Sequence, residues 1–229
     1  MSVYRRGYKA LLVSTFKLLP TRRMIMLAFV FAYTGIEQSF WMGIYPTCIS
    51  FTQKLGENTN ALLALNAITS GFGQIVAGGL FGILGSRSAH RIGRDAIVFL
   101  GTSIHLVVFV GVYINLPADS PLKKTDDISV IEPSVVLALI CGFLLGFGDA
   151  CWNTQIYALL VATFPNQSSQ AFALYKFYQS ALSCAAFFYG SVMQLQYHLG
   201  ILVVTSLIAA VSFFTVEREA RNKLSDPVP

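Results

Sequence analysis

The sequence predicts an all-α membrane protein of six transmembrane helices, and two observations carry this prediction. First, 55% of the 229 residues are hydrophobic and 12% are charged, whereas soluble domains average roughly 45–50% and about 25%. Second, the apolar residues form continuous runs close to the roughly 20 residues of helix that cross a bilayer. In lipid, only helices and closed barrels form hydrogen bonds with all of their own backbone N–H and C=O groups. Continuous apolar runs favour helices, because the strands of a barrel alternate apolar and polar residues.

The polar and charged segments between the runs set the order and the ends of the spans. The first span follows Arg22-Arg23, and arginines within residues 87–94 separate the second span from the third. The acidic segment Pro117–Pro133 separates the third from the fourth, which is longer than a bilayer needs and therefore tilts or extends beyond it. The predicted spans are Met24–Tyr45, Ala61–Leu84, Ala96–Leu116, Ser134–Phe164, Ala171–Met193 and Leu199–Val216.

The distribution of Lys and Arg predicts the orientation, because basic residues accumulate in cytoplasmic segments. Most of the 16 basic residues lie before the first span, between the second and third spans, or after the sixth. Lys54, Lys123 and Lys124 lie on the opposite side. We therefore expect both termini to be cytoplasmic, with a basic segment over residues 1–23 that holds an interfacial helix (Ala10–Leu19), a six-helix half-domain over 24–216, and a cytoplasmic tail over 217–229.

The remaining composition excludes several classes of function. The net charge of +5 requires no nucleic acid as a partner, because the basic residues are scattered beside the spans and form no basic aromatic patch. The four cysteines form no C-x-x-C pair, which argues against a disulfide framework and against a metal site. The sequence contains no nucleophile elbow or phosphate loop. It therefore favours neither an enzyme nor a bound cofactor, and the lipid bilayer is the first expected partner.

Four ionisable residues lie within predicted spans, and we expect each to face a cavity or a partner. A charged side chain at a helix centre costs about 2.5–3.5 kcal/mol on insertion scales. Asp149 and Lys176 lie at comparable depth on adjacent antiparallel spans, so they form an ion pair or face one aqueous cavity. A static pair that only joins two helices is equally compatible. For His105, a hydrogen bond to a neighbouring helix is the favoured interpretation.

The fourth ionisable residue, Glu37, has no evident partner in the sequence. It either lines a pathway as a proton or cation site, or it is buried as a neutral acid. It belongs to a polar and aromatic stripe on one face of the first span, formed by Thr34, Glu37, Gln38, Trp41 and Tyr45. We expect a cavity or ion-coupling site that contains Glu37, Trp41, Asp149, Asn153 and Lys176.

Small-residue faces predict close packing of helices. One face, in the second span, contains Asn66, Ser70, Gly73 and Ala77, with Gly78-x-x-x-Gly82 beyond it, and another contains Gly142-x-x-x-Gly146. Such motifs indicate that helices touch there and imply no further function.

Several segments resemble the uncoordinated-93-like branch of the major facilitator superfamily. In the loop Ser86–Asp95, Arg91, Gly93 and Arg94 match the loop between the second and third helices of each half in that superfamily. Ser86, His90 and Asp95 depart from its pattern. The more specific segments are Tyr33-Thr34-Gly35-Ile36-Glu37-Gln38-Ser39-Phe40-Trp41, Gly146-Phe147-Gly148-Asp149-Ala150-Cys151-Trp152-Asn153-Thr154-Gln155 and Ala171-Phe172-Ala173-Leu174-Tyr175-Lys176.

The resemblance implies a fold and an incomplete transport path. The spans would correspond to helices 7–12 of a major facilitator fold, arranged as two inverted three-helix repeats with Glu37 and Asp149 at related positions. Arg91, Gly93 and Arg94 would form a gating loop. Because the path forms between two six-helix halves, we expect a truncated half that lacks its N-terminal half. Pairing as a homodimer or with another half is the alternative.

Two functions fit these expectations. The first is a solute transporter of the major facilitator type, with the polar residues named above in its cavity. The second, which the resemblance also implies, is a non-transporting protein that regulates an ion channel through one of its subunits or acts in trafficking. Both fit the plasma membrane and internal membranes equally, and fold alone does not choose between them.

Overall fold

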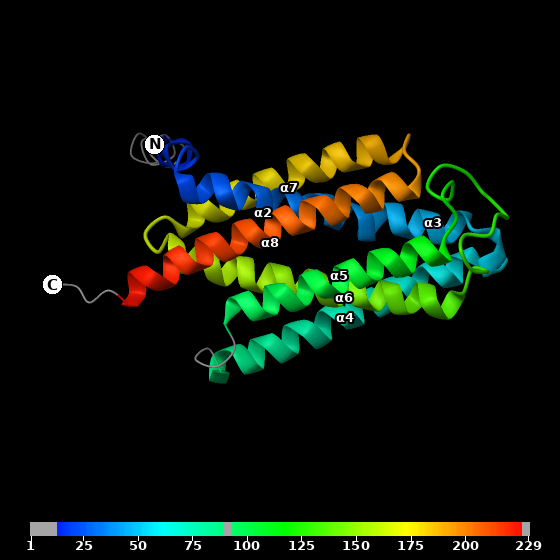
Figure 1. Ribbon diagram of the computed structural model, residues 1–229, viewed down its shortest axis with the longest axis horizontal. Coiled ribbons are helices and arrows are strands. Elements are labelled where there is room, and N and C mark those ends of the chain that lie inside the picture. Colours follow the sequence, from blue (N-terminus) through cyan, green and yellow to red (C-terminus); the bar gives the residue numbers. More distant parts are fainter. Residues whose placement is uncertain (1–12, 89–92, 226–229) are drawn as a thin grey trace, which may run out of the picture.

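The computed structural model describes residues 13–88 and 93–225, and this part of the chain folds into a bundle of long antiparallel helices without a strand (Figure 1). Residues 13–18 of the predicted interfacial helix are helical, whereas residues 10–12 lie outside the described part. The elements are α2 (Arg22–Ser39), η1 (Phe40–Ile44), α3 (Tyr45–Phe51), η2 (Gln53–Leu55), α4 (Thr59–Ser88), α5 (Arg94–Asn115), α6 (Val135–Thr163), α7 (Ser168–Gly190) and α8 (Leu195–Ser225).

Five of the described helical segments are long and apolar enough to cross a membrane. They are Arg22–Phe51, Thr59–Phe81, Arg94–Asn115, Val135–Thr163 and Leu195–Asn222, and they confirm five of the predicted spans. The span predicted at Ala171–Met193 corresponds to α7, which ends at Gly190, before the predicted end, and is more polar because it carries Lys176 and Gln179. The sixth span therefore stays a prediction.

Three helices extend beyond their predicted ends, and the shortest extension is in α4, which ends at Ser88 and not at Leu84. The first span was expected to end at Tyr45, but helix continues through α3 to Phe51. The last was expected to give way to a tail after Val216, but α8 continues to Ser225. In α8 the charged residue Glu217 is buried and paired with arginines, so the end of the apolar run does not end the helix.

The exposed faces of the bundle are rich in large apolar side chains. Examples on different helices are Ile75, Phe99, Val136, Phe188 and Val211, and Phe188 is 85% exposed. In contrast, the acid Glu37 and the imidazole of His105 are buried inside. Apolar side chains outside and polar groups inside are the arrangement expected of helices surrounded by lipid.

The helices contact one another in a series that runs α7, α2, α8, α5, α6 and α4. Phe31 in α2 packs on Tyr175 in α7, with ring centroids 4.8 Å apart. The series begins with α7 and ends with α4, and both contribute to the pocket described below, together with α2 and α6. This order places α2 between α7 and α8, and α6 between α5 and α4.

A π-helical turn, η1, interrupts the first long helix next to Pro46. The N–H of Tyr45 bonds to the carbonyl oxygen of Phe40, five residues back. Proline has no N–H and its ring clashes with the carbonyl oxygen four residues earlier, so the ordinary bond pattern cannot continue through Pro46. The wider turn accommodates the proline, and it changes the faces on which Trp41 and Tyr45 lie.

Glycines let α4 and α6 pack backbone against backbone. A β carbon on Gly73 would overlap the carbonyl oxygen of Phe143, and one on Gly146 would overlap that of Ser70. These contacts confirm the close packing predicted for the two small-residue faces. The first face was also predicted to continue to Gly78. This part of the prediction was wrong, because a β carbon on Gly78 meets no atom within 4 Å.

The segment between α5 and α6 covers the end of the bundle opposite Arg22 and Ser225 (Figure 1). Its backbone pairs with the start of η2 through Gln53 N–H and Thr125 O, 3.0 Å apart. Asp119 accepts hydrogen bonds from Lys123 and from Gln194, just before α8. These two donors, Lys123 first, hold the pKa of Asp119 below its ordinary value. The segment therefore ties α3 to the start of α8.

The contact between α4 and α6 gives a prediction with a matched control. Gly146→Ala gains helix propensity but inserts a methyl group into the backbone of Ser70, so we expect a net loss of stability from an overpacking cost of about 1–3 kcal/mol. Gly78→Ala gains the same propensity in open space and should be at least as stable as the wild type. Thermal unfolding in detergent, followed by circular dichroism, compares them. Equal stability of the two variants would contradict the backbone contact.

Candidate functional site

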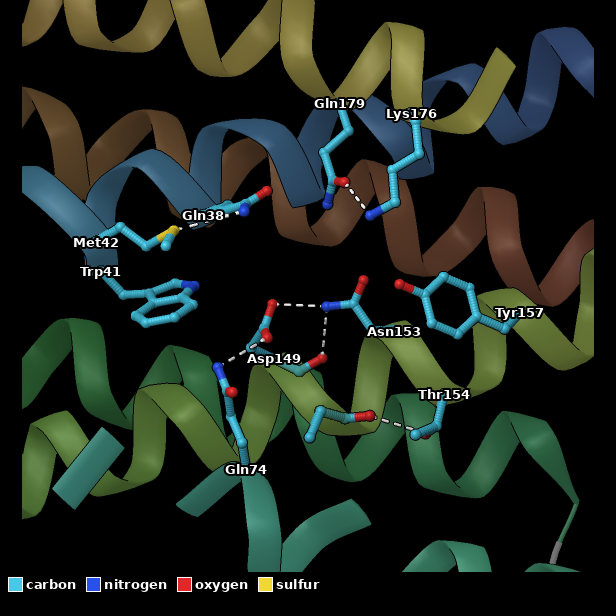
Figure 2. Close-up of a pocket in the computed structure, with 11 residues that line it drawn as sticks. Gln38, Trp41, Met42, Gln74, Asp149, Asn153, Thr154, Tyr157, Lys176 and Gln179 are labelled. Carbon is cyan, nitrogen blue, oxygen red and sulfur yellow. Dashed lines mark hydrogen bonds between the residues drawn. The ribbon is translucent and has the colours of Figure 1, made fainter. Parts of the chain in front are cut away.

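A pocket of about 390 Å³ opens between α2, α4, α6 and α7 (Figure 2). It lies near the middle of these helices and combines aromatic walls with polar and charged groups. Its lining residues are Gln38, Trp41, Met42, Gln74, Asp149, Ala150, Asn153, Thr154, Tyr157, Lys176 and Gln179. The structure thus brings Trp41, Asp149, Asn153 and Lys176, all expected at the site from the sequence, to one pocket.

Asp149 lies on the α6 wall of the pocket and accepts hydrogen bonds on both carboxylate oxygens (Figure 2). Asn153 Nδ2, one turn further along α6, donates to Oδ1 at 2.7 Å. Gln74 Nε2, from α4, donates to Oδ2 at 3.3 Å. Two amide donors therefore replace part of the water that a carboxylate would otherwise require.

A chain of hydrogen bonds connects Lys176 to Asp149 without direct contact between them. Lys176 Nζ donates to Gln179 Oε1 at 2.7 Å, and Gln179 Nε2 donates to the Tyr175 hydroxyl at 3.0 Å. The Tyr175 hydroxyl donates to Asn153 Oδ1 at 2.5 Å, and Asn153 donates to Asp149. Every donor points toward the carboxylate, so we call this chain the polar relay.

The polar relay decides between the two arrangements predicted for Asp149 and Lys176. No ion pair joins them within the described part of the chain, and both face the common pocket. The ammonium group of Lys176 lies 4.7 Å from the ring centroid of Tyr175 and 5.8 Å from that of Tyr157. Aromatic faces attract cations at such distances. The two opposite charges are therefore held apart across the pocket.

Glu37 lies behind the pocket and does not line it. It is 1% exposed, and its carboxyl group is within hydrogen-bonding reach of the Asp149 carboxyl. Its Oε1 lies 3.5 Å from His105 Nε2 but has no hydrogen-bond partner among the described residues. No partner for Glu37 was evident in the sequence, because both neighbours come from helices that are distant along the chain.

His105, in α5, is held by two hydrogen bonds to other helices, as the sequence predicted. Its Nδ1 pairs with the Tyr33 hydroxyl of α2, and its Nε2 lies 3.3 Å from the carbonyl oxygen of Leu145 in α6. A carbonyl oxygen only accepts, so Nε2 carries the hydrogen and Nδ1 accepts from Tyr33. A β carbon on Gly148 would overlap the imidazole ring, so this glycine admits His105 between the helices.

Sequence analysis missed the groups that connect the predicted residues. Gln74, Tyr157, Tyr175 and Gln179 were not proposed as site residues. A signal for Gln179 existed, since it follows Lys176 by three residues and therefore lies on the same helix face. Gln74 gave no such signal, because its position opposite Asp149 depends on the packing of α4 against α6.

The predicted gating loop meets the end of α8. Arg91 lies outside the described residues, and Gly93 directly precedes α5. Arg94 Nε pairs with Glu217 Oε2 at 2.7 Å, and Arg221 of α8 pairs with Asp95 at 2.6 Å. The carboxyl side chain of Glu217 is only 4% exposed and lies 3.4 Å from Arg221. This group of charges, which we call the α5–α8 clamp, joins the start of α5 to α8.

The groups at the pocket determine what it can bind. The described residues include no cluster of histidine, cysteine and acidic side chains that could hold a metal ion. The pocket offers a carboxylate from α6, an ammonium group from α7 on the opposite side, and amides from α4, α6 and α7, with the indole of Trp41 beside them (Figure 2). Such a surface can bind a small polar solute.

The family of the chain emerges from comparison with known proteins. A family profile described as "Ion channel regulatory protein UNC-93" matches residues 4–214. UNC93-like protein MFSD11 of Xenopus laevis is 41% identical over 204 residues, which are 88% of this chain and 45% of that protein. Protein unc-93 homolog A of Danio rerio is 28% identical over 95% of this chain and 42% of its own length.

A more distant relative shows the same similarity in sequence. UNC93-like protein 3 of Arabidopsis thaliana is 27% identical over 89% of this chain and 40% of its own length. The chain thus spans less than half the length of these relatives. No solved structure matches it.

The pocket predicts different reactivity for cysteines on its wall and on the outer surface. In a cysteine-free background, Thr154→Cys should react with a charged, membrane-impermeant thiol reagent at least about tenfold faster than Val107→Cys, because Val107 is exposed near the middle of α5 and a thiolate forms only in contact with water. Mass spectrometry of protein in liposomes measures both rates. Equal rates, or faster labelling of Val107→Cys, would show that the pocket is not aqueous.

Proposed function

The chain belongs to the UNC-93 family of multi-pass membrane proteins, and from this premise we propose that it forms one wall of a solute-transport path of the major facilitator type. The observation that carries the proposal is the pair of opposite charges, Asp149 and Lys176, held apart across one pocket by the polar relay. A static structural pair would neutralise itself by direct contact. Charges that are separated and open to a pocket are available to a solute. The proposed role is binding and transport rather than catalysis.

A sixth span and an inverted repeat are part of this proposal. The 23 residues of α7 extend about 34 Å at 1.5 Å per residue, enough to cross a bilayer. Exchanging α2 with α6, α4 with α7 and α5 with α8 maps the principal helix contacts onto one another. The pair α4 and α6 becomes α7 and α2, for example. This symmetry supports two three-helix repeats related by a pseudo-two-fold axis.

The repeat would place the two acids at the centre of the fold. Glu37 and Asp149 lie on the exchanged helices α2 and α6, and their carboxyl groups meet where the repeats join. The remaining wall of the path would come from a second six-helix half, supplied by an N-terminal half or by a homodimer. The α5–α8 clamp, with Arg94 and Gly93 of the predicted gating loop, would close the path at one end.

The orientation follows from the basic residues. The end of the bundle that carries Arg22, Arg94 and Arg221 would be cytoplasmic, as the distribution of Lys and Arg predicts. Both termini would then lie in the cytoplasm. Glu219 of α8 lies 3.5 Å from Arg22 and from Arg23 of α2, so charges at this end also join α2 to α8.

A second candidate function comes from the family description, which names an ion channel regulatory protein. In this role the chain would bind a channel subunit through its exposed apolar faces and would carry no solute. The same polar relay would then stabilise the bundle only. The two functions differ in whether the charges at the pocket are needed for flux.

Uptake into liposomes tests the proposal. The chain is reconstituted both alone, at a density that lets two copies pair, and together with a six-helix N-terminal half, and mass spectrometry measures accumulation from a panel of amino acids, amines, organic anions and sugars. We expect accumulation of at least one solute class, reduced at least about tenfold in Asp149→Asn, because hydrogen bonds to a charged group contribute about 1.5–3 kcal/mol.

Asp126→Asn is the matched control, because Asp126 is exposed in the segment between α5 and α6. It should leave uptake unchanged. Uptake equal to empty liposomes in both the wild type and Asp149→Asn would contradict transport by this chain. Binding of a channel subunit under those conditions, unchanged by Asp149→Asn, would support the regulatory role.

A further inference from the structure

The contact between Glu37 and Asp149 requires a proton. Glu37 is 1% exposed, and the two carboxyl groups are within hydrogen-bonding reach of each other. Two carboxylates in contact repel each other strongly where water is excluded. A carboxylate has no hydrogen to donate, so a hydrogen bond between two acids exists only when one of them is protonated. Two acids in such contact therefore need at least one proton between them.

The surrounding donors indicate which acid carries that proton. Both oxygens of Asp149 accept hydrogen bonds, from Asn153 and from Gln74, as expected of a carboxylate. In contrast, Glu37 Oε1 is buried without a hydrogen-bond partner. The N–H at His105 Nε2 is directed to Leu145 and does not serve it. Burying an oxygen without a hydrogen-bond partner costs much more free energy for a carboxylate than for a neutral carboxylic acid. This difference places the proton on Glu37.

We propose that Glu37 and Asp149 form a binding site for one exchangeable proton, which Glu37 stores and Asp149 passes to the pocket. Asp149 lines the pocket and Glu37 does not, so Asp149 is the only one of the two acids placed there to exchange with water. In the transfer, the O–H bond of Glu37 breaks as a new O–H bond forms on Asp149, and the bonding electron pair stays on Glu37. The proton then leaves Asp149 for water.

Other titratable groups surround this pair. Neutral His105 and Tyr33 enclose the Glu37 side, and Lys176 acts on Asp149 through the polar relay. Among the described residues these groups are Tyr33 from α2, His105 from α5, Cys151 from α6, and Tyr175 and Lys176 from α7, whereas α4 contributes the neutral amide of Gln74. Lys176 is the cation of this set, and it neutralises one negative charge of the pair but not two.

Release of the proton therefore has a mechanical consequence. It leaves two negative charges in contact between α2 and α6, and their repulsion favours separation of these helices or entry of water or a cation. The idea that this change moves a solute through the pocket rests on the proposed function. Proton binding itself does not, because every group of the site lies on α2, α4, α5, α6 or α7 of this chain.

Infrared difference spectroscopy tests the proton site on the intact chain. The protein is purified in a detergent without ester groups, and the carbonyl stretch of protonated carboxylic acids is recorded at neutral pH, where acids with ordinary pKa values near 4 are ionised. We expect a band from one protonated carboxyl that shifts in heavy water. Glu37→Gln should abolish it, and Glu132→Gln, at an exposed position, should leave it intact.

A second variant keeps the test decisive if Glu37→Gln does not fold, as judged by circular dichroism. In Asp149→Asn the acceptor of the Glu37 hydroxyl changes from a carboxylate to an amide, so the band should remain but move in frequency. Absence of the band in the wild type would overturn the proposal. So would a band that survives in folded Glu37→Gln, or one that is unchanged in Asp149→Asn. None of these outcomes depends on whether the chain moves a solute.

Discussion

The contact between two acids, Glu37 of α2 and Asp149 of α6, is the constraint on which the rest of the interior depends. An ionised acid within a membrane-spanning helix is costly unless other groups replace water. Gln74, Asn153 and the polar relay perform this replacement for Asp149. Glu37 has no comparable set of donors, and a proton makes its burial tolerable. Three helices that pack on α2 or α6, namely α4, α5 and α7, thus contribute polar groups around the acid pair.

The backbone makes room for this interior at a few defined positions. A β carbon on Gly35 would overlap the backbone carbonyl of Gln179, so this glycine brings α2 against α7. Gly148 admits the imidazole of His105, and Gly146 brings α6 against α4. These contacts set the distances between the polar groups. The π turn before Pro46 then directs Trp41 to the pocket and leaves the Tyr45 hydroxyl to donate to the carbonyl of Ala138 at 2.6 Å.

The sequence predicted the helices well because lipid imposes a simple rule on composition and length. Five spans and the close packing at Gly146 followed from that rule and from small-residue spacing. Lys176 and Gln179 lower the apolar character of α7, so composition alone does not count it as a span. Position on a helix face identified Trp41, Asp149, Asn153 and Lys176 but could not show which helix would oppose each one. For that reason the partners of Glu37, which come from α5 and α6, were not predicted.

Solid-state nuclear magnetic resonance of the carbon-13-labelled chain in lipid bilayers tests the central claim most directly, because it reports both the contact and the proton. The account predicts a through-space signal between Glu37 Cδ and Asp149 Cγ, with the chemical shift of a protonated acid at Glu37 and of a carboxylate at Asp149. Two carboxylate shifts without a signal between these carbons would contradict it. The buried acids would then be separate, and the interior described here would have another organisation.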